Sequence, residues 1–295
     1  MTTDIKLDHQ LIETFRQIVD DHYRLRGRRL PWRETTDPYH ILVSEIMLQQ
    51  TQVQRVWDKF TEFVGRFPDV PTLSSASMHD VLETWQGLGY NRRARSLKES
   101  AELIMERHQG KVPDEEASLV GLPGVGTATA RAVQAFAFNK PVVFIETNIR
   151  TVYLHHFFEG RERVPDRELE PFVEQTLDRE NPRRWYNALM DYGVFLKHDQ
   201  GNPSRASYHY TRQSPFEGST RQVRGAVLRR LLNSDPVPYR RLAKELPFEN
   251  SRVEEALRGL EADGLITRRG SRVSIDRERP VDGKATTPRS EEKDQ

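Results

Sequence analysis

The sequence predicts a mostly α-helical protein that ends in a small unit of mixed α and β structure. Apolar residues recur at helical spacing from residue 9 to about residue 196, and short Pro- and Gly-containing turns separate the helices. In that region only residues 140–146, KPVVFIE, have the composition of a β-strand. After residue 219 the pattern changes to three helical segments, followed by two short strands around Gly270.

The helices predicted before residue 196 follow one another closely. The second has the clearest start signal, because Asp37 can cap its N-terminus and Pro38 suits its first position. The apolar spacing predicts helices over residues 9–25, 36–49, 51–68, 78–86, 93–110, 115–122 and 127–138.

The C-terminal segment has the element order of a winged helix-turn-helix domain. Its three helices and its hairpin are predicted over residues 220–233, 238–246, 251–264 and 265–275. A purely structural or partner-binding α+β unit would have the same pattern, and both interpretations stay open. We predict a domain over residues 1–213, a winged-helix-like domain over residues 214–276 and a polar, disordered tail over residues 277–295.

The composition excludes several classes of protein. The 295 residues carry a net charge of +1, so a surface that binds a polyanion must be local. There is no cysteine, which excludes disulfides, thiolate zinc sites and cysteine-ligated iron–sulfur clusters. No stretch has the length of a membrane span, and the N-terminus lacks the features of a signal peptide. We therefore expect a cytoplasmic protein that needs no cofactor and no metal.

The segment LVGLPGVGTATARAV consists of two helical stretches joined by a tight turn. Gly124 and Gly126 let the backbone turn sharply around Val125, directly before a helix N-terminus. Backbone N–H groups in that arrangement bind a phosphate without a positively charged side chain. Two nearby glycines alone usually indicate only a turn. With Leu119 before them and Thr129 after them, the pattern resembles the helix-hairpin-helix motif, which binds the DNA backbone without sequence preference.

Two acidic residues stand out by their surroundings. Glu45 lies on the apolar stripe of its predicted helix, four residues after Ile41. A carboxyl group among apolar side chains holds its proton near neutral pH and can act as an acid. Glu146 directly follows the predicted strand and precedes Asn148 by two residues. By itself, Glu146 is most simply an acid that interacts favourably with a helix N-terminus.

Five segments in order resemble the helix-hairpin-helix DNA glycosylases of base excision repair, within the endonuclease III superfamily. They are LPWR, SEIMLQQTQV, GLGYNRRARSL, LPGVG and NALMDYG. The resemblance covers about residues 10–196 and is strongest to the mismatch-specific adenine glycosylases, the MutY class. It implies a two-lobed helix-hairpin-helix glycosylase fold before the winged-helix-like domain. It also implies double-stranded DNA with a mispaired or damaged base as the partner.

The resemblance implies a role for each residue of the motifs. Glu45 matches the acid that protonates adenine, Glu146 the carboxylate that faces the positive charge developing on the sugar, and Asn148 an orienting group. A base that is cut from duplex DNA must first be flipped into a dry pocket, where an acid of raised pKa can protonate it. The resemblance also implies DNA contacts by Gln49, Gln50, Tyr90, Arg92, Gly124, Val125 and Gly126, and a base pocket lined by Leu30, Trp32 and Arg33.

The chain departs from this family in three places. Glu146 stands where the family has an aspartate, so the carboxylate is displaced by one methylene group. The family's four-cysteine loop contains other residues here, and an ungapped comparison puts Lys197, Ser204, Ser207 and Gln213 at the four positions. Hydrogen bonds and packing must hold this loop instead, and the candidates are Tyr208, His209 and Tyr210.

The third departure is at the C-terminus. Typical adenine glycosylases end in a Nudix-like domain, and here the winged-helix-like segment occupies that place. A preference for oxidised guanine therefore does not follow from the resemblance. The basic turn of this segment, with Arg268, Arg269 and Arg272, can add a phosphate contact, and the segment can bind a repair-protein partner.

The residue that follows the hairpin predicts the type of reaction. Family members that also cut the strand have a Schiff-base lysine there, and this chain has Ala128, which cannot form an imine. We therefore predict a monofunctional glycosylase that hydrolyses the N-glycosidic bond of adenine mispaired with guanine or oxidised guanine. Two alternatives stay open: the same chemistry on thymine, uracil or another damaged base, and a non-catalytic DNA-binding protein on the same scaffold.

Overall fold

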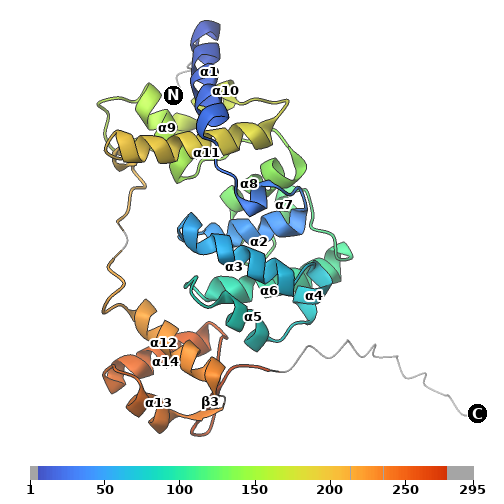
Figure 1. Cartoon of the computed structure of the whole chain (residues 1–295), viewed down its shortest axis with the longest axis vertical. Coiled ribbons are helices and arrows are strands. Elements are labelled where there is room, and N and C mark those ends of the chain that lie inside the picture. Colours follow the sequence, from blue (N-terminus) through green and yellow to red (C-terminus); the bar gives the residue numbers. More distant parts are fainter. Residues whose placement is uncertain (1–5, 213, 235, 278–295) are drawn as a thin grey trace, which may run out of the picture.

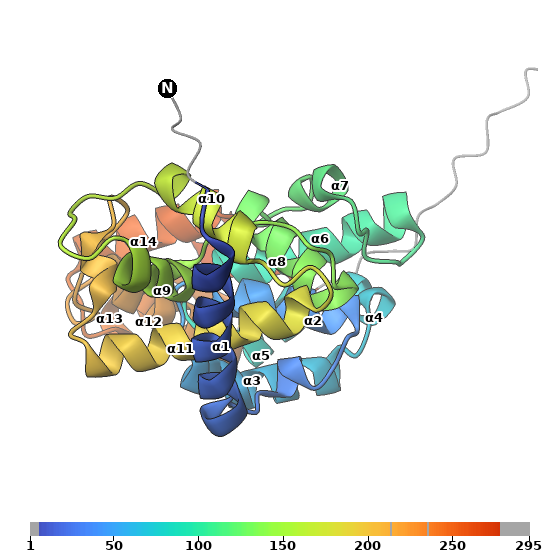
Figure 2. The same ribbon diagram turned by 90° about the horizontal axis from the view of Figure 1, so that it is seen from above.

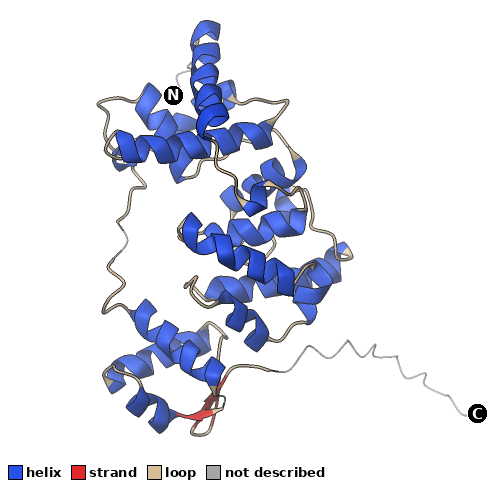
Figure 3. Cartoon of the chain, in the orientation of Figure 1, coloured by secondary structure: helices blue, strands red, loops and turns tan. Residues whose placement is uncertain are grey.

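The computed structural model of the chain describes residues 6–212, 214–234 and 236–277. Within these residues the protein is mostly helical, as predicted, and its strands lie in the C-terminal unit (Figure 3). The predicted boundary at residue 213 and residues 278–295 of the predicted tail (277–295) lie outside the described residues. None of the described helices is both long and apolar enough to cross a bilayer.

One lobe is built from the helices between residues 31 and 138 and occupies the middle of Figure 1. Its second helix begins as predicted, because the Asp37 side chain accepts hydrogen bonds from the backbone N–H groups of Tyr39 (2.8 Å) and His40 (3.1 Å). The elements of this lobe are η1 (Pro31–Arg33), α2 (Pro38–Leu48), α3 (Val53–Arg66), α4 (Val70–Ser75), α5 (Met78–Trp85), α6 (Arg92–His108), α7 (Glu116–Val120) and α8 (Thr127–Phe138).

The other lobe combines the first helix of the chain with the helices that follow residue 146. Figure 2, which looks down on this lobe, shows its first helix lying across its last one. The elements are α1 (His9–Arg26), α9 (Thr147–Phe157), α10 (Asp166–Thr176), α11 (Pro182–Asp199) and η2 (Pro203–Ala206). Helix α8 packs against both α2 and α11, so the helix that follows the glycine turn joins the two lobes.

The C-terminal unit has the predicted three helices and hairpin, with one more short strand before the second helix. The sheet order is β1-β3-β2, and both pairings are antiparallel. The elements are α12 (Thr220–Asn233), β1 (Val237–Pro238), α13 (Tyr239–Glu245), α14 (Asn250–Ala262), β2 (Thr267–Arg269) and β3 (Arg272–Ser274).

The strand predicted over residues 140–146 is wrong. The segment has no regular secondary structure and pairs with no strand in the described part of the chain. Side chains of neighbouring helices bind its carbonyl groups instead: the Tyr186 hydroxyl donates to the carbonyl of Val142 (2.7 Å) and Arg131 donates to that of Val143 (3.1 Å). A β-like composition indicates only a half-buried segment. A strand also needs a neighbouring strand that pairs with its backbone.

Candidate active site

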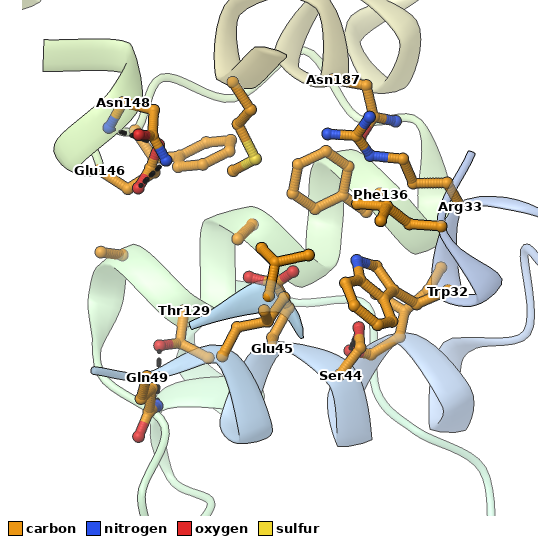
Figure 4. Close-up of a pocket in the computed structure, with 18 of the residues that line it drawn as sticks. Trp32, Arg33, Ser44, Glu45, Gln49, Thr129, Phe136, Glu146, Asn148 and Asn187 are labelled. Carbon is orange, nitrogen blue, oxygen red and sulfur yellow. Dashed lines mark hydrogen bonds between the residues drawn. The ribbon is translucent and has the colours of Figure 1, made fainter. Parts of the chain in front are cut away.

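A cavity of about 310 Å³ lies where α2, α8, α9 and α11 meet. In Figure 4, Glu45 points from α2 into this cavity, with Trp32 and Arg33 on one side and Glu146 and Asn148 on the other. The walls are mainly apolar and aromatic, and they include Leu30, Trp32, Ile41, Phe136, Phe144 and Met190. All three predicted base-pocket residues therefore line the same cavity as the two predicted carboxylates.

Glu45 is surrounded by protein, and its remaining accessible surface opens into the cavity. Burial raises the pKa of Glu45 to about 8, since a carboxylate loses its hydration there. Repulsion by the charge of Glu146 raises this pKa further, and Arg33 acts in the opposite direction. Glu45 therefore carries a proton at neutral pH and can donate it to a group that enters the cavity.

Glu146 both caps a helix and lines the cavity. Its Oε1 accepts hydrogen bonds from the backbone N–H groups of Asn148 (2.7 Å) and Ile149 (3.2 Å), so the side chain folds back onto the first turn of α9. The interpretation of Glu146 as a helix N-terminal acid is correct. It does not exclude the role that the resemblance implies, which is a carboxylate that faces the sugar. The same geometry fixes a carboxylate beside the cavity.

Asn148 is held between Glu146 and a lysine of α11. Lys197 Nζ donates to Asn148 Oδ1 (2.7 Å), and Asn148 Nδ2 lies 3.5 Å from Glu146 Oε2. An ammonium group can only donate, so it fixes the amide with its oxygen toward Lys197 and its nitrogen toward Glu146. Burial lowers the pKa of Lys197, and the nearby charge of Glu146 partly restores it. In the ungapped comparison with the family, Lys197 stands at the first of the four cysteine positions.

Helices α9 and α11 are in tight contact at this point. A Cβ atom on Gly193 of α11 would lie 2.2 Å from the backbone oxygen of Asn148. No larger residue fits there without moving the first turn of α9. Gly193 therefore fixes the position of Asn148 relative to the cavity.

A buried ion pair holds the wall formed by LPWR. Asp191 of α11 accepts hydrogen bonds from Nη1 and Nη2 of Arg33 (2.9 Å each) and from the backbone N–H of Arg28 (2.7 Å). The side chains of Asp191 and Arg33 are 1% and 8% exposed. Burial by itself would raise the pKa of Asp191, but the hydrogen bonds and charges of Arg33 and Arg28 hold it below its usual value. Asp191 therefore ties one wall of the cavity to α11.

The two predicted glutamines follow α2 directly and also line the cavity. Gln49 Nε2 donates to the carbonyl of Gly124 (3.1 Å) and to Thr129 Oγ1 (3.3 Å), which joins the end of α2 to the glycine turn. Gln50 is exposed, and its backbone is left-handed (φ 54°). A non-glycine residue in that conformation is strained, and such strain concentrates at functional sites.

The arginines after Tyr90 have three different surroundings. Arg92 is exposed at the start of α6. Arg95 donates to the backbone oxygen of Asp263 in the C-terminal unit. Arg93 is largely enclosed, and burial lowers its pKa to about 10.

Arg93 holds the turn that contains the two glutamines. Its Nη1 donates to the carbonyls of Ile46 (2.9 Å) and Met47 (2.8 Å), and its Nη2 donates to Thr51 Oγ1 (2.9 Å). Its guanidinium carbon also lies 5.4 Å from the centre of the Tyr90 ring. The donors of Arg93 therefore bind the C-terminal end of α2. A run of arginines in the sequence does not distinguish such a buried residue from an exposed one.

The glycine turn has the predicted helix-hairpin-helix geometry. Gly124 is left-handed (φ 79°), and a Cβ there would lie 2.8 Å from Ser96 Cβ. Gly126 has an ordinary φ and open space around it, and it caps the N-terminus of α8. Val125 has a buried side chain and donates its N–H to the carbonyl of Leu122 (3.1 Å). The outward surface of the turn is therefore backbone at Gly126 and at the first residues of α8.

The loop after α11 does not fit an iron–sulfur cluster. The ammonium group of Lys197 binds Asn148, Ser204 donates to Asn202, Ser207 accepts the N–H of His209, and Gln213 lies outside the described residues. None of these groups is a thiolate. Backbone pairing with Val164 holds the loop instead: Val164 donates to the carbonyl of Ala206, and its own carbonyl accepts from Tyr208 (2.9 Å each).

Sequence reasoning missed several residues that line the cavity. Phe136, Phe144, Asn187 and Met190 come from three different segments. Only Asn187 and Met190 had a signal, because NALMDYG places them three residues apart on one helix face. Leu48 also lines the cavity, whereas Met47 and Trp85 are fully buried.

Comparisons with known proteins identify the same class of scaffold. Residues 43–174 match the model of the HhH-GPD superfamily of base excision DNA repair proteins. An adenine DNA glycosylase of Mycobacterium tuberculosis (strain CDC 1551 / Oshkosh) is 35% identical over 271 residues, which cover 83% of this chain and 88% of that protein. An adenine DNA glycosylase of Buchnera aphidicola subsp. Baizongia pistaciae is 33% identical and covers 62% of this chain and 52% of its own length.

Solved structures share the fold. A thermostable thymine-DNA glycosylase superposes with a TM-score of 0.58 at 23% identity, over 68% of this chain and 97% of that one. A trapped covalent intermediate of endonuclease III with DNA superposes with a TM-score of 0.50 at 20% identity, over 72% of this chain and 92% of that one. At these identities the likeness concerns the fold.

Proposed function

The chain belongs to the HhH-GPD superfamily of base excision DNA repair proteins, and we propose that it is a monofunctional glycosylase that removes mispaired adenine from duplex DNA. Its substrate would be adenine opposite guanine or oxidised guanine, and its products the free base and an abasic site. One observation carries the proposal: Glu45 lies in a cavity with apolar and aromatic walls, where burial raises its pKa to about 8. The adenine glycosylases among the relatives support adenine as the base.

The cavity suits a flipped base. Its volume of about 310 Å³ lies in the range of small-ligand sites, and Trp32, Phe136 and Phe144 provide apolar surface for a planar ring. Base flipping costs a few kcal/mol, and contacts with such walls offset a part of that cost.

The chemistry needs two carboxyl groups in different protonation states. Glu45 donates its proton to N7 of the adenine as the bond between the base nitrogen and the sugar carbon breaks, and the bonding electrons leave with the base. Glu146 faces the positive charge that develops on the sugar, and water then adds to that carbon. Asn148, fixed by Lys197, orients the sugar, the phosphate or the attacking water.

DNA binding would use the residues around the mouth of the cavity. The backbone at Gly126 and the N-terminus of α8 offer N–H groups to a phosphate, and Arg92 is an exposed cation on the neighbouring helix. Gln50 and Tyr90 both have left-handed backbone conformations, which supports their role as the residues that enter the duplex (φ 54° and 45°).

The absence of a lysine at the reacting face supports hydrolysis without strand cleavage. Ala128 lies in the first turn of α8 and lines the cavity, and none of the described lining residues is a lysine. We propose that the enzyme works without a metal or cluster, since Glu45, Glu146 and water supply the groups that the reaction needs.

A single-turnover assay tests this function. We expect the protein to release adenine from duplexes with A opposite G and A opposite oxidised G, and strand breaks to appear only after alkali treatment. Release of thymine or uracil from T·G or U·G duplexes instead would assign the pocket to another base. Breaks without alkali would contradict the monofunctional reaction, and binding without release of any base would favour the non-catalytic alternative.

Replacing Lys197 by Met is expected to slow adenine release about tenfold to a hundredfold, because a small misplacement of a reacting group costs up to about a hundredfold. The substitution removes the donor to Asn148 Oδ1, so the amide can rotate away from Glu146. Single-turnover rates on the A·G duplex measure the effect. Lys111→Met on the exposed surface is the control, and equal rates in both variants would contradict the role of Lys197.

A further inference from the structure

We propose that the C-terminal unit contributes to recognition of the lesion. Arg221 of α12 would be a positioning residue that holds Tyr90 in its DNA-contacting conformation. The inference rests on the proposed function in one respect, which is that Tyr90 contacts DNA. Four observations support it: the strain at Tyr90, the contact with Arg221, the docking of the unit and the charges of α14.

Tyr90 needs external support. Its φ of 45° is unfavourable for a residue with a ring, and its loop contains Gly87 and Gly89, both also at positive φ. A loop with two glycines has many alternative conformations, so the observed one must be held by contacts. Arg93 contacts the ring from its own helix. The second support comes from outside the lobe.

Arg221 contacts Tyr90 in two ways. Its Nη1 donates to the Tyr90 hydroxyl (3.0 Å), and its guanidinium carbon lies 5.6 Å from the centre of the ring. Its Nη2 donates to the carbonyl of Ser214 (2.7 Å), in the segment that connects α11 with α12. The guanidinium is therefore fixed at both ends, and it links Tyr90 to the C-terminal unit.

The unit is docked against α5 and α6 by specific contacts. His79 Nε2 lies 3.3 Å from the carbonyl oxygen of Leu232, and its backbone N–H donates to that of Asp276 (3.0 Å). Arg95 donates to the carbonyl of Asp263, beside Gly264. A Cβ on Gly264 would lie 1.9 Å from Arg95 Nη1, so this contact requires glycine. Figure 1 shows the unit next to α5, on the side of the lobe away from α11.

The charges of α14 argue against an independent DNA-binding role. A helix-turn-helix domain places its second helix in the major groove, where phosphates repel acidic side chains. Here α14 carries three glutamates (Glu254, Glu255 and Glu261) against two arginines (Arg252 and Arg258), so its net charge is −1. Arg268 of the basic turn lies 2.9 Å from Glu254 and 3.4 Å from Glu261, so it is neutralised by that helix. Arg268 is therefore paired with α14 in this structure, whereas Arg269 and Arg272 are exposed.

The range of the Mycobacterium tuberculosis match is consistent with a role inside the glycosylase. It covers 83% of this chain, which exceeds the 213 residues before the predicted C-terminal domain. Part of the C-terminal unit is therefore shared with that relative, whereas the Buchnera match covers 62% of the chain.

The test compares Arg221→Met with Arg229→Met, an exposed arginine of the same helix, in the full chain. We expect Arg221→Met to speed amide exchange in residues 86–92 about tenfold and to weaken binding to a duplex with an abasic-site analogue by a similar factor. Arg229→Met should change neither. Tyr90→Phe removes the hydroxyl and keeps the ring, and its effect should be smaller in the Arg221→Met background than alone.

Gly264→Val provides a second route, because it separates Arg95 from the C-terminal unit without altering Arg221 or Tyr90. It should increase exchange in residues 86–92 as well. Unchanged exchange in Arg221→Met, or an affinity equal to that of Arg229→Met, would overturn the inference. The exchange measurement uses the free protein, so it decides the role of Arg221 even if no base were released. A failure of base release by the unmodified protein would refute only the proposed function.

Discussion

Replacing Glu45 by Gln is expected to reduce adenine release by about 10²- to 10⁴-fold, the usual contribution of a general acid. Glutamine has nearly the same shape as protonated glutamic acid, so the cavity keeps its form and only the transferable proton is lost. Single-turnover rates on the A·G duplex measure the loss. Binding to an abasic-site analogue is the control and should stay close to that of the unmodified protein.

The pH dependence follows from the same group. Burial raises the pKa of Glu45 to about 8, so the protonated, donating form predominates below that pH. The rate is therefore expected to fall as the pH rises through about 8. A rate that stays constant up to pH 9 in the unmodified protein, or a Gln variant as fast as the native enzyme, would contradict the role of Glu45.

The same substitution is also expected to change how the free energy of unfolding depends on pH. The ordinary carboxyl pKa is 4.5, and the folded value is higher, so the folded state binds more protons between these two values. Glu45 therefore lowers the free energy of unfolding progressively as the pH rises from 4.5 to about 8. In the Glu45→Gln variant no carboxyl group titrates at this position, so this fall in the free energy of unfolding is absent. We therefore expect the variant to be more stable than the native protein at pH 8. Urea unfolding at pH 5 and pH 8 measures the difference.

Replacing Asp191 by Asn is expected to lower the free energy of unfolding by about 3–5 kcal/mol, the usual cost of removing one partner from a buried ion pair. Arg33 would keep its charge in a site where its side chain is 8% exposed. It would lose the carboxylate that accepts hydrogen bonds from its Nη1 and Nη2 atoms. Adenine release should fall too, because Asp191 ties the wall with Leu30 and Trp32 to α11. Urea unfolding and the single-turnover assay measure the two effects.

The contribution of Asp191 also depends on pH. Its folded pKa is lower than the ordinary value of 3.8, so its stabilisation is present above that pH and is lost as the pH falls through the folded pKa. The control is Asp199→Asn at the exposed end of the same helix, which should change the stability by less than about 0.5 kcal/mol. Similar unfolding energies for the two variants would contradict the structural role of Asp191.

Local signals in the sequence predicted those parts of the site that depend on neighbouring residues. Asp37 and Pro38 indicated the start of α2, and an acid on the apolar stripe of that helix indicated a protonated Glu45. The glycine turn was recognisable because Gly124 and Gly126 stand one residue apart directly before a helix, and Gly124 has the left-handed backbone that favours glycine. Such features act within one or two helical turns, so a single segment contains them completely.

Interpretations that needed a partner from elsewhere in the chain were less reliable. Residues 140–146 have the composition of a strand, but no neighbouring strand pairs with them in the described structure. Arg93 and Arg95 belong to one basic run, yet one binds the end of α2 and the other binds the C-terminal unit. The sequence lists such charges without their partners, and the partner decides whether a charge is structural or free.

The sequence by itself determined the helical fold class, the position of the glycine turn, the lack of any thiol ligand and the acid at position 45, because each follows from residue type and short-range spacing. Only the tertiary structure decided that Lys197 fixes Asn148, that Asp191 anchors the pocket wall and that Arg221 contacts Tyr90. These pairs lie between 49 and 158 residues apart in the chain. Their interaction energies depend on distances of about 3 Å, which the packing of helices fixes and which no local pattern encodes.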